Sequence, residues 1–165
     1  MMIRFFSNIY QNKILHYNHK KYWKRRQIVV DPKSKVPKII KYLYLLYLRK
    51  IDAYNCAEIA TGLASGAYFK NTPNLPHGIK GIFIHGTAII GENCTIQQQV
   101  TIGTRKINKS AIIGDNVFIG AGAKLLGDIR IGNNAKIGAN AVVLDDVPDN
   151  CTVVGVPARI IKEVK

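Results

Sequence analysis

The sequence predicts an all-β solenoid of short parallel strands, preceded by a basic helical arm. Large aliphatic residues recur at every sixth position, a smaller apolar residue follows most of them four positions later, and glycine often stands directly after the aliphatic. A period of six fits neither the 3.6-residue period of an amphipathic helix nor the two-residue alternation of a strand. It fits a short strand followed by a corner, so that three units close one triangular coil of about 18 residues.

The two apolar sets are expected to fill the inside of the stacked coils, the large residues from the strands and the smaller ones from the bends. The large set is Ile84, Ile90, Ile96, Ile102, Ile113, Ile119, Leu125, Ile131, Ile137 and Val143. The smaller set is Ala88, Cys94, Val100, Val117, Ala123, Ile129, Ala135, Ala141 and Val147. The eleven-residue step after Ile102 is one repeat plus an insertion. Glycines and asparagine-containing pairs such as Asp115-Asn116 are expected to relieve the backbone where φ is unusual.

The chain divides into a basic arm at 1–55, the solenoid at 56–147 and a C-terminal cap or tail at 148–165. Net charge is +14, and residues 1–50 hold 13 Lys and Arg against the single acid Asp31. Such an arm could attract a polyanion, including an anionic membrane surface, or form a solvated face beside a subunit interface. No nucleic-acid partner is expected, because no reading motif accompanies the charge.

Within the arm, residues 37–55 are expected to form a helix, with Pro37 in the first turn and Ser34 as a candidate cap. Its predicted apolar stripe consists of Ile39, Ile40, Leu43, Leu46, Tyr47 and Ile51. Leu45 and Leu48 make the helix apolar nearly all round. A helix of this kind is buried by partners or lies at a membrane interface, and burial against other subunits is favoured.

The sequence favours a cytoplasmic protein, with peripheral attachment at the inner face of the membrane left open. The N-terminus has no continuous apolar stretch typical of a signal peptide, and the longest apolar run is interrupted by Lys41. Cys56, Cys94 and Cys151 lack the spacing of a disulfide framework or a zinc site. They are expected to be reduced core residues.

Three segments carry a resemblance to a known family. Residues 90–103 (IGENCTIQQQVTIG), 112–148 (IIGDNVFIGAGAKLLGDIRIGNNAKIGANAVVLDDVP) and 153–161 (VVGVPARII) resemble the hexapeptide-repeat acyltransferases. Within these they look most like the serine O-acetyltransferase branch and its relatives that acetylate cell-envelope polysaccharides. The resemblance implies a left-handed parallel β-helix, a homotrimer with active sites in the clefts between neighbouring prisms, and acetyl-CoA as co-substrate.

O-acetyl transfer needs a base that takes the proton of the attacking hydroxyl, and histidine suits this task because its ordinary pKa is about 6.5. His16 and His19 lie in the arm and are expected on the surface. The resemblance implies that His77, in NLPHGIKGIFI, is the general base, although residues 78–80 make the following spacer one residue longer than in the serine enzymes. The alternative is a structural loop histidine. His85 is the second choice, as base or substrate contact.

The resemblance also implies an acid that orients the base, and Glu58 holds the matching position; the alternative is a solvated corner glutamate. The insertion at 103–112 lacks the further histidine with which the serine enzymes contact substrate, which weakens the case for free serine. Arg105, with Lys106 and Lys109, could instead bind an anionic acceptor or simply be solvated.

For the donor, the resemblance lays the pantetheine arm of CoA along corners of small residues and pairs the CoA phosphates with basic residues near the C-terminus. The implied residues are Gly120, Ala121, Gly138, Ala139, Arg159 and Lys162. Small side chains let a thin thioester arm lie against backbone groups, although glycine also has a purely structural role in the coil. No metal is expected.

We therefore expect an acetyl-CoA-dependent O-acetyltransferase that acts on a cell-envelope saccharide or on L-serine. A saccharide is modestly preferred, because the arm is shorter than the helical domain of serine enzymes. One alternative is a serine O-acetyltransferase of cysteine synthesis proper. Another is a γ-carbonic-anhydrase-like metalloenzyme, for which the repeat lacks a third histidine. The non-enzymatic alternative is a polyanion-binding scaffold.

Overall fold

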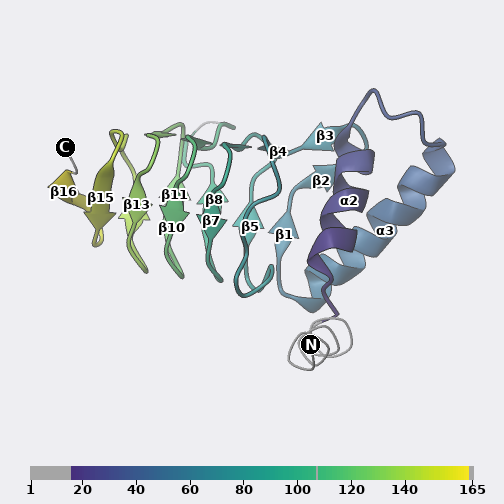
Figure 1. The fold of residues 1–165 in the computed structure, drawn as a ribbon, viewed down its shortest axis with the longest axis horizontal. Helices are drawn as coiled ribbons and strands as arrows, with labels where there is room; N and C mark the ends of the chain where they lie inside the picture. The colour runs from purple at the N-terminus through teal and green to yellow at the C-terminus, as the bar shows by residue number, and fades with distance from the viewer. Residues whose placement is uncertain (1–15, 107, 164–165) are drawn as a thin grey trace.

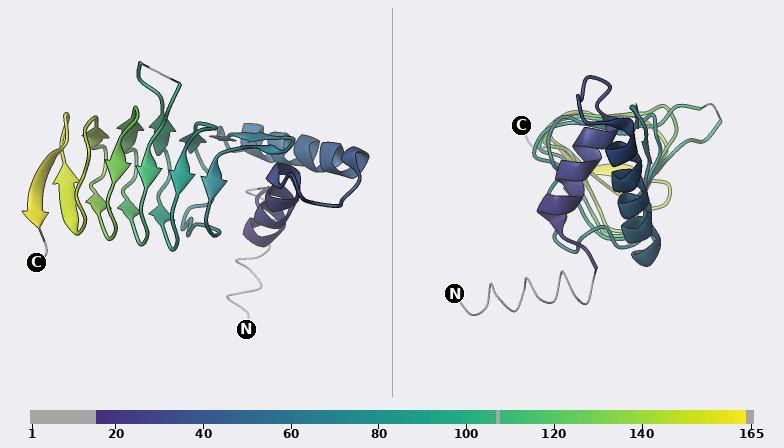
Figure 2. Two further views of the ribbon diagram at one scale, coloured as in Figure 1. Left: turned by 90° about the horizontal axis from the view of Figure 1, so that it is seen from above. Right: turned by 90° about the vertical axis from the view of Figure 1, so that its right-hand side faces the viewer.

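The structure is a computed structural model that describes residues 16–106 and 108–163, and it confirms the parallel β-helix. Short strands wind around a prism, and two helices pack at its N-terminal end (Figure 1). Viewed along the prism, the coils superimpose and the helices lie across the end (Figure 2). The described residues thus form one solenoid and one helical cap.

Three stacks of strands form the faces of the prism, and most neighbours are parallel. The first face contains β1 (Glu58–Ile59), β5 (Phe83–Ile84), β8 (Thr101–Gly103), β11 (Lys124–Leu126) and β14 (Val142–Val143). The second contains β4 (Tyr68–Phe69), β6 (Ile89–Ile90), β9 (Ile112–Ile113) and β12 (Arg130–Ile131). The third contains β7 (Thr95–Ile96), β10 (Phe118–Ile119), β13 (Lys136–Ile137), β15 (Cys151–Val154) and β16 (Arg159–Glu163). A hairpin, β2 (Thr61–Gly62) and β3 (Ser65–Gly66), interrupts the first coil.

The six-residue repeat produces the core because the strand register keeps like residues above one another. Ile84 pairs with Ile102, which pairs with Leu125 one coil further on. Every residue of the large set is at most 3% exposed, and every residue of the smaller set at most 5%. Both predicted sets are therefore confirmed as the core, and its apolar burial is the main source of stability.

Asparagine and glycine have different structural roles at the corners: asparagine adopts the left-handed conformation, and glycine leaves room for the next coil. Asn116 and Asn134 take the left-handed conformation, with φ of +58° and +57°. Gly120 does not; a Cβ there would lie 2.6 Å from the backbone N of Ala139 in the next coil. The expectation that glycines following the large aliphatics relieve unusual φ is wrong, because none of them has positive φ. All of them except Gly103 instead allow consecutive coils to approach closely.

The C-terminal strands extend and then close the solenoid. β15 pairs in parallel with β13, so the winding continues beyond residue 147 to Val154. β16 then folds back antiparallel onto β15. The last parallel strand is thereby covered by a strand of the chain itself, as an exposed sheet edge requires.

The two helices are α2 (His19–Val30) and α3 (Lys38–Tyr54). Asn18 caps α2 by accepting a hydrogen bond from the backbone N–H of Lys21 at 2.9 Å. Ser34 does not cap α3; the helix begins after Pro37 without a side-chain cap. That prediction is wrong because Ser34 lies in the preceding turn, 3.5 Å from the backbone N of Val36.

The helix at residues 38–54 is confirmed, but it presents a different face to the rest of the chain from the one predicted. Leu45, Leu48 and Ile51 are buried. Ile39 and Leu43, from the predicted stripe, are 66% and 57% exposed. The helix is apolar nearly all round, so its sequence pattern did not distinguish the two faces.

Cys94 and Cys151 are buried, as predicted, but Cys56 is exposed. Cys56 adopts φ of +48° directly after α3, where the chain turns into the first coil. No helix within residues 16–106 and 108–163 combines the length and apolar character that a bilayer crossing requires.

Candidate functional site at the His77 edge

One edge of the prism gathers most of the residues implied for catalysis and donor binding. We call it the His77 edge; it consists of the corners 75–82, 97–100, 120–123 and 138–141, which join the third face to the first. Backbone hydrogen bonds connect these corners in order: Gln99 N–H to Lys80 O, Gly122 N–H to Gln98 O, and Asn140 N–H to Ala121 O, at 2.8–2.9 Å. The four corners therefore form a continuous column.

His77 lies at the start of this column, in the turn that leads into β5. Its side chain is exposed, and the turn is held by a hydrogen bond from Gly78 N–H to Leu75 O at 3.0 Å. Gly78 adopts φ of +67°, and an added Cβ would lie 3.1 Å from the ring of Tyr17. The turn is thus fixed by local backbone geometry while the imidazole remains accessible.

The small residues implied for CoA binding lie further along the same column. Gly120 is buried, Ala121 and Gly138 are half-buried, and Ala139 is exposed. An added Cβ at Gly138 would lie 2.7 Å from Cγ1 of Val154. The two glycines therefore have a structural role, and the two alanines line the surface of the column.

Arg159 lies beyond the last of these corners, at the start of β16. It is exposed, and its Nη1 donates to the backbone O of Ala158 at 2.9 Å. Ala158 N–H in turn donates to Val142 O at 2.8 Å, so this turn stacks on the end of the first face. The side chain of Lys162 lies outside the described residues.

Glu58 and His85 line a separate groove of about 350 Å³ on the first face, together with Phe83 and Thr101. Nδ1 of His85 lies 3.0 Å from Oγ1 of Thr87 and accepts a hydrogen bond from the Thr87 backbone N–H at 3.3 Å. Within the described part of the chain, no hydrogen bond joins Glu58 to His77. The groove thus associates Glu58 with His85, and orientation of His77 by Glu58 stays a prediction.

The insertion projects from another edge, between the first and second faces (Figure 2). Its base is closed by a hydrogen bond from Ser110 Oγ to Gly103 O at 3.1 Å, and Lys109 pairs with Asp128 at 3.4 Å. Arg105 is exposed and packs near Gly127. Within one chain, the predicted acceptor residue Arg105 and the candidate base His77 therefore occupy different edges.

A second pocket, which the sequence did not indicate, borders the His77 edge. It measures about 550 Å³ and is lined by residues from the end of α3 and by Lys80 and Gln98. Oε1 of Gln98 is buried and has no hydrogen-bond partner among the described residues. A buried carbonyl oxygen without a donor is costly. Because this oxygen is closed off from the surface, it is not open to a molecule in the pocket.

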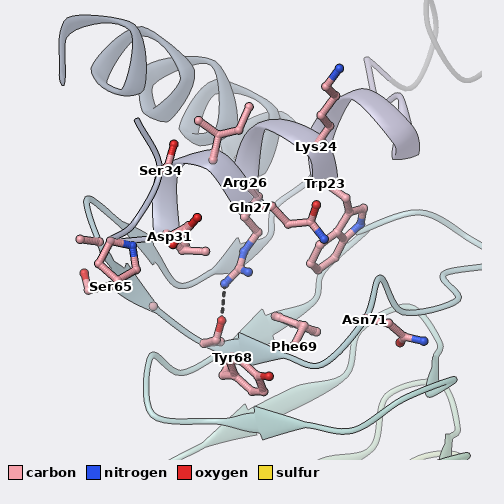
Figure 3. A pocket seen from close by; sticks show the side chains of 16 residues that line it. Trp23, Lys24, Arg26, Gln27, Asp31, Ser34, Ser65, Tyr68, Phe69 and Asn71 are labelled. Atoms are coloured by element: carbon pink, nitrogen blue, oxygen red, sulfur yellow. Dashed lines mark hydrogen bonds between the residues drawn. The ribbon is translucent and has the colours of Figure 1, made fainter. Parts of the chain in front are cut away.

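Another pocket lies between α2 and the first coil and measures about 620 Å³ (Figure 3). Arg26 extends from α2 toward the coil and is only 2% exposed. Its guanidinium donates to the backbone oxygens of Ala60 and Ala67 at 3.1 and 2.7 Å. Trp23 and Phe69 flank it, with ring centroids 5.4 and 4.8 Å away. Sequence reasoning treated this arginine as part of a basic arm and missed its role as a cap on the solenoid.

Burial also changes the protonation of groups behind this pocket. It raises the pKa of Asp52 to about 7 and lowers the pKa of Arg26 to about 10. Tyr22 is fully buried, and its pKa is raised well above the ordinary value by the same cause. These groups hold the two helices against each other and against the first coil. In the described residues, no group of three His, Cys, Asp or Glu side chains is arranged to hold a metal.

Comparisons with known proteins agree with the β-helical fold. Residues 110–145 match the family model described as bacterial transferase hexapeptide (six repeats). A serine acetyltransferase of Synechococcus elongatus is 39% identical over 129 residues, which cover 76% of this chain and 48% of that protein.

Two solved structures are similar over most of the chain. The serine acetyltransferase of Neisseria gonorrhoeae in complex with serine has a TM-score of 0.66 at 32% identity, covering 87% of this chain and 55% of that one. The enzyme of Brucella abortus in complex with coenzyme A has a TM-score of 0.67 at 30% identity, covering 88% and 55%. The chain spans about half the length of these relatives. In both sequence and fold, most of this chain is similar to about half of a serine acetyltransferase, and residues 110–145 match the hexapeptide-repeat family.

Proposed function

We propose that the chain is an acetyl-CoA-dependent O-acetyltransferase with a small hydroxyl acceptor, and that L-serine is the first acceptor to test. The observation that carries the proposal is the common edge of His77 and the small-residue corners at 120–123 and 138–141. The similar structures in complex with serine and with coenzyme A support the two substrates. The preference for a saccharide finds no support among the relatives compared, which are serine acetyltransferases.

In the proposed reaction, His77 accepts the proton of the acceptor hydroxyl as its oxygen attacks the thioester carbonyl. The C–S bond then breaks, the acetyl group remains on the acceptor oxygen, and His77 returns the proton to the departing sulfur. Exposed backbone N–H groups of the corners are suited to hold the oxyanion between these steps. The imidazole is accessible, so it can meet both substrates.

The pocket beside the His77 edge is our candidate site for the acceptor. The exposed side-chain amide of Gln99 can accept a hydrogen bond from an ammonium or hydroxyl group, and Lys80 can attract a carboxylate. An amino acid with a hydroxyl side chain has all three groups. The alanines of the donor corners and Arg159 provide a path for the pantetheine arm and a cation for a phosphate.

We further propose a homotrimer. His77 and Arg105 occupy different edges of one prism, so a site that uses both needs the loop of a neighbouring copy. Light scattering on the eluting protein should give three times the chain mass of 18.4 kDa. A monomer with full activity would exclude a shared site.

A free-CoA release assay tests the activity directly. The protein is incubated with acetyl-CoA and, in separate reactions, with L-serine, nucleotide sugars and oligosaccharides. We expect acceptor-dependent thiol release with L-serine and a matching yield of O-acetylserine by mass spectrometry. Release with a sugar alone would redirect the proposal to a saccharide acceptor. No release with any acceptor would refute it.

A further inference from the structure

The outer face of α3 is an apolar surface that the chain leaves uncovered. Ile39, Tyr42, Leu43 and Leu46 are 47–66% exposed. They stand at i, i+3, i+4 and i+7, so they lie along one side of the helix. The start of α3 projects beyond the first coil, where the solenoid does not reach it (Figure 2).

Positive charge surrounds this surface and no acid interrupts it. Arg49 and Lys50 follow Leu46 by three and four residues, so they continue the stripe, and Lys38 stands four residues before Tyr42. All three are exposed. Residues 16–55 contain 11 Lys and Arg against the two acids Asp31 and Asp52. Asp52, the one acid of α3, is buried and accepts a hydrogen bond from Tyr22.

We infer that this face of α3 docks on the surface of an anionic lipid bilayer. An apolar stripe with flanking cations suits the boundary between acyl chains and negatively charged head groups. A second copy of the same face suits it less, because like charges at Lys38, Arg49 and Lys50 would meet without an acid to pair with them. The helix is too short and too charged to span the bilayer, so it would lie along the surface.

Vesicle co-sedimentation of the full chain tests the inference. The probes are vesicles of phosphatidylcholine alone and of phosphatidylcholine mixed with phosphatidylglycerol. We expect binding to the anionic vesicles only, and weaker binding at high salt, which shortens the range of exposed charges. Absence of binding to anionic vesicles would overturn the inference.

Two matched pairs of variants then locate the contact. Leu43→Asp should weaken binding at least tenfold, whereas Leu63→Asp should not, because Leu63 is similarly exposed at 47% but lies in the β2–β3 turn. The double variant Arg49→Gln/Lys50→Gln should weaken binding by roughly fivefold per charge removed. Lys136→Gln, on the third face, is its control.

Light scattering separates the membrane from a protein partner. If Leu43→Asp leaves vesicle binding intact, or lowers it no more than Leu63→Asp does, the assignment of this face is wrong. If Leu43→Asp instead splits the assembly, the face is a subunit contact and the inference is also wrong. Should Leu43→Asp fail to fold, the double charge variant carries the same comparison.

Discussion

The hydroxyl of Tyr22 donates a 2.6 Å hydrogen bond to Oδ1 of Asp52, which joins α2 to the end of α3 inside the helical cap. Both residues are at most 8% exposed. The carboxylate has lost most of its contact with water, and burial outweighs the hydrogen bond and the nearby Arg26 in setting its pKa. Protonation of Asp52 is therefore coupled to the stability of the cap.

We expect the free energy of unfolding to fall as the pH rises from about 4 to above 7. The pKa of Asp52 is raised from 3.8 to about 7, so the folded state binds a proton that the unfolded state releases. The contribution is complete below the unfolded pKa and is lost as the pH rises through the folded pKa. Its size is roughly 4 kcal/mol, at about 1.36 kcal/mol per pKa unit. Urea denaturation across this pH range measures it.

Asp52→Asn is the control for this prediction. The amide oxygen still accepts the hydrogen bond from Tyr22 but carries no charge. We expect the variant to lose the component of pH dependence that lies between pH 4 and 7. If the stability profiles of variant and wild type run parallel, Asp52 is not the coupled group.

Arg26→Met should destabilise the protein by about 2–4 kcal/mol, because the backbone oxygens of Ala60 and Ala67 lose a buried donor. Arg25→Met provides the comparison. Arg25 stacks on Tyr44 and Tyr47 at 5.0 and 4.1 Å and should lose only about 0.5–1 kcal/mol. Chemical denaturation measures both, and equal losses would argue against the capping role.

Gly120→Ala should destabilise the β-helix by several kcal/mol, since the new Cβ would meet the backbone of Ala139. Gly103→Ala should be much milder, because its Cβ would meet only side-chain atoms at 3.5 Å or more. Both glycines directly follow a large inward aliphatic. Thermal unfolding followed by circular dichroism compares them, and similar melting temperatures would refute the close-packing account.

His77→Ala should lower kcat by roughly 10²–10⁴ if His77 is the general base. The assembly and the circular dichroism spectrum should not change, because the side chain is exposed. His85→Ala should reduce turnover far less. Single-turnover and steady-state CoA release distinguish the two, and a larger loss for His85→Ala would transfer the role of base to that residue.

The sequence predicted the solenoid well because the residues at the repeated apolar positions are the ones that are buried. Each inward position, from Ile84 to Val143, is repeated often enough to fix the register of its neighbours. In the helical cap, the sequence predicted α3 but not α2 or the contacts that α2 makes. The stretch from His19 to Val30 is rich in Lys and Arg, and no pattern shows that Arg26 serves backbone oxygens distant in sequence.

For the candidate site, the sequence predicted the parts that follow from the repeat, but not the contacts between segments distant in sequence. The corners containing Gly120 and Gly138 follow from counting repeats, so their alignment on one edge could be anticipated. The orphaned oxygen of Gln98 could not, because it depends on how the end of α3 meets the second coil. In the proposed homotrimer, the relation of His77 to Arg105 would depend on how two copies meet, which the repeat pattern of one chain does not describe.

Because the corners stack regularly, the distance along the solenoid increases by the same step with each coil. Each coil adds one strand spacing of about 4.8 Å between His77 and the turn that holds Arg159. If CoA binds along these corners as proposed, the number of coils, and not any single side chain, sets the reach between the reactive end of the donor and its charged end. Adding or removing one complete coil would keep the strand register and would suit the protein to a donor of another length.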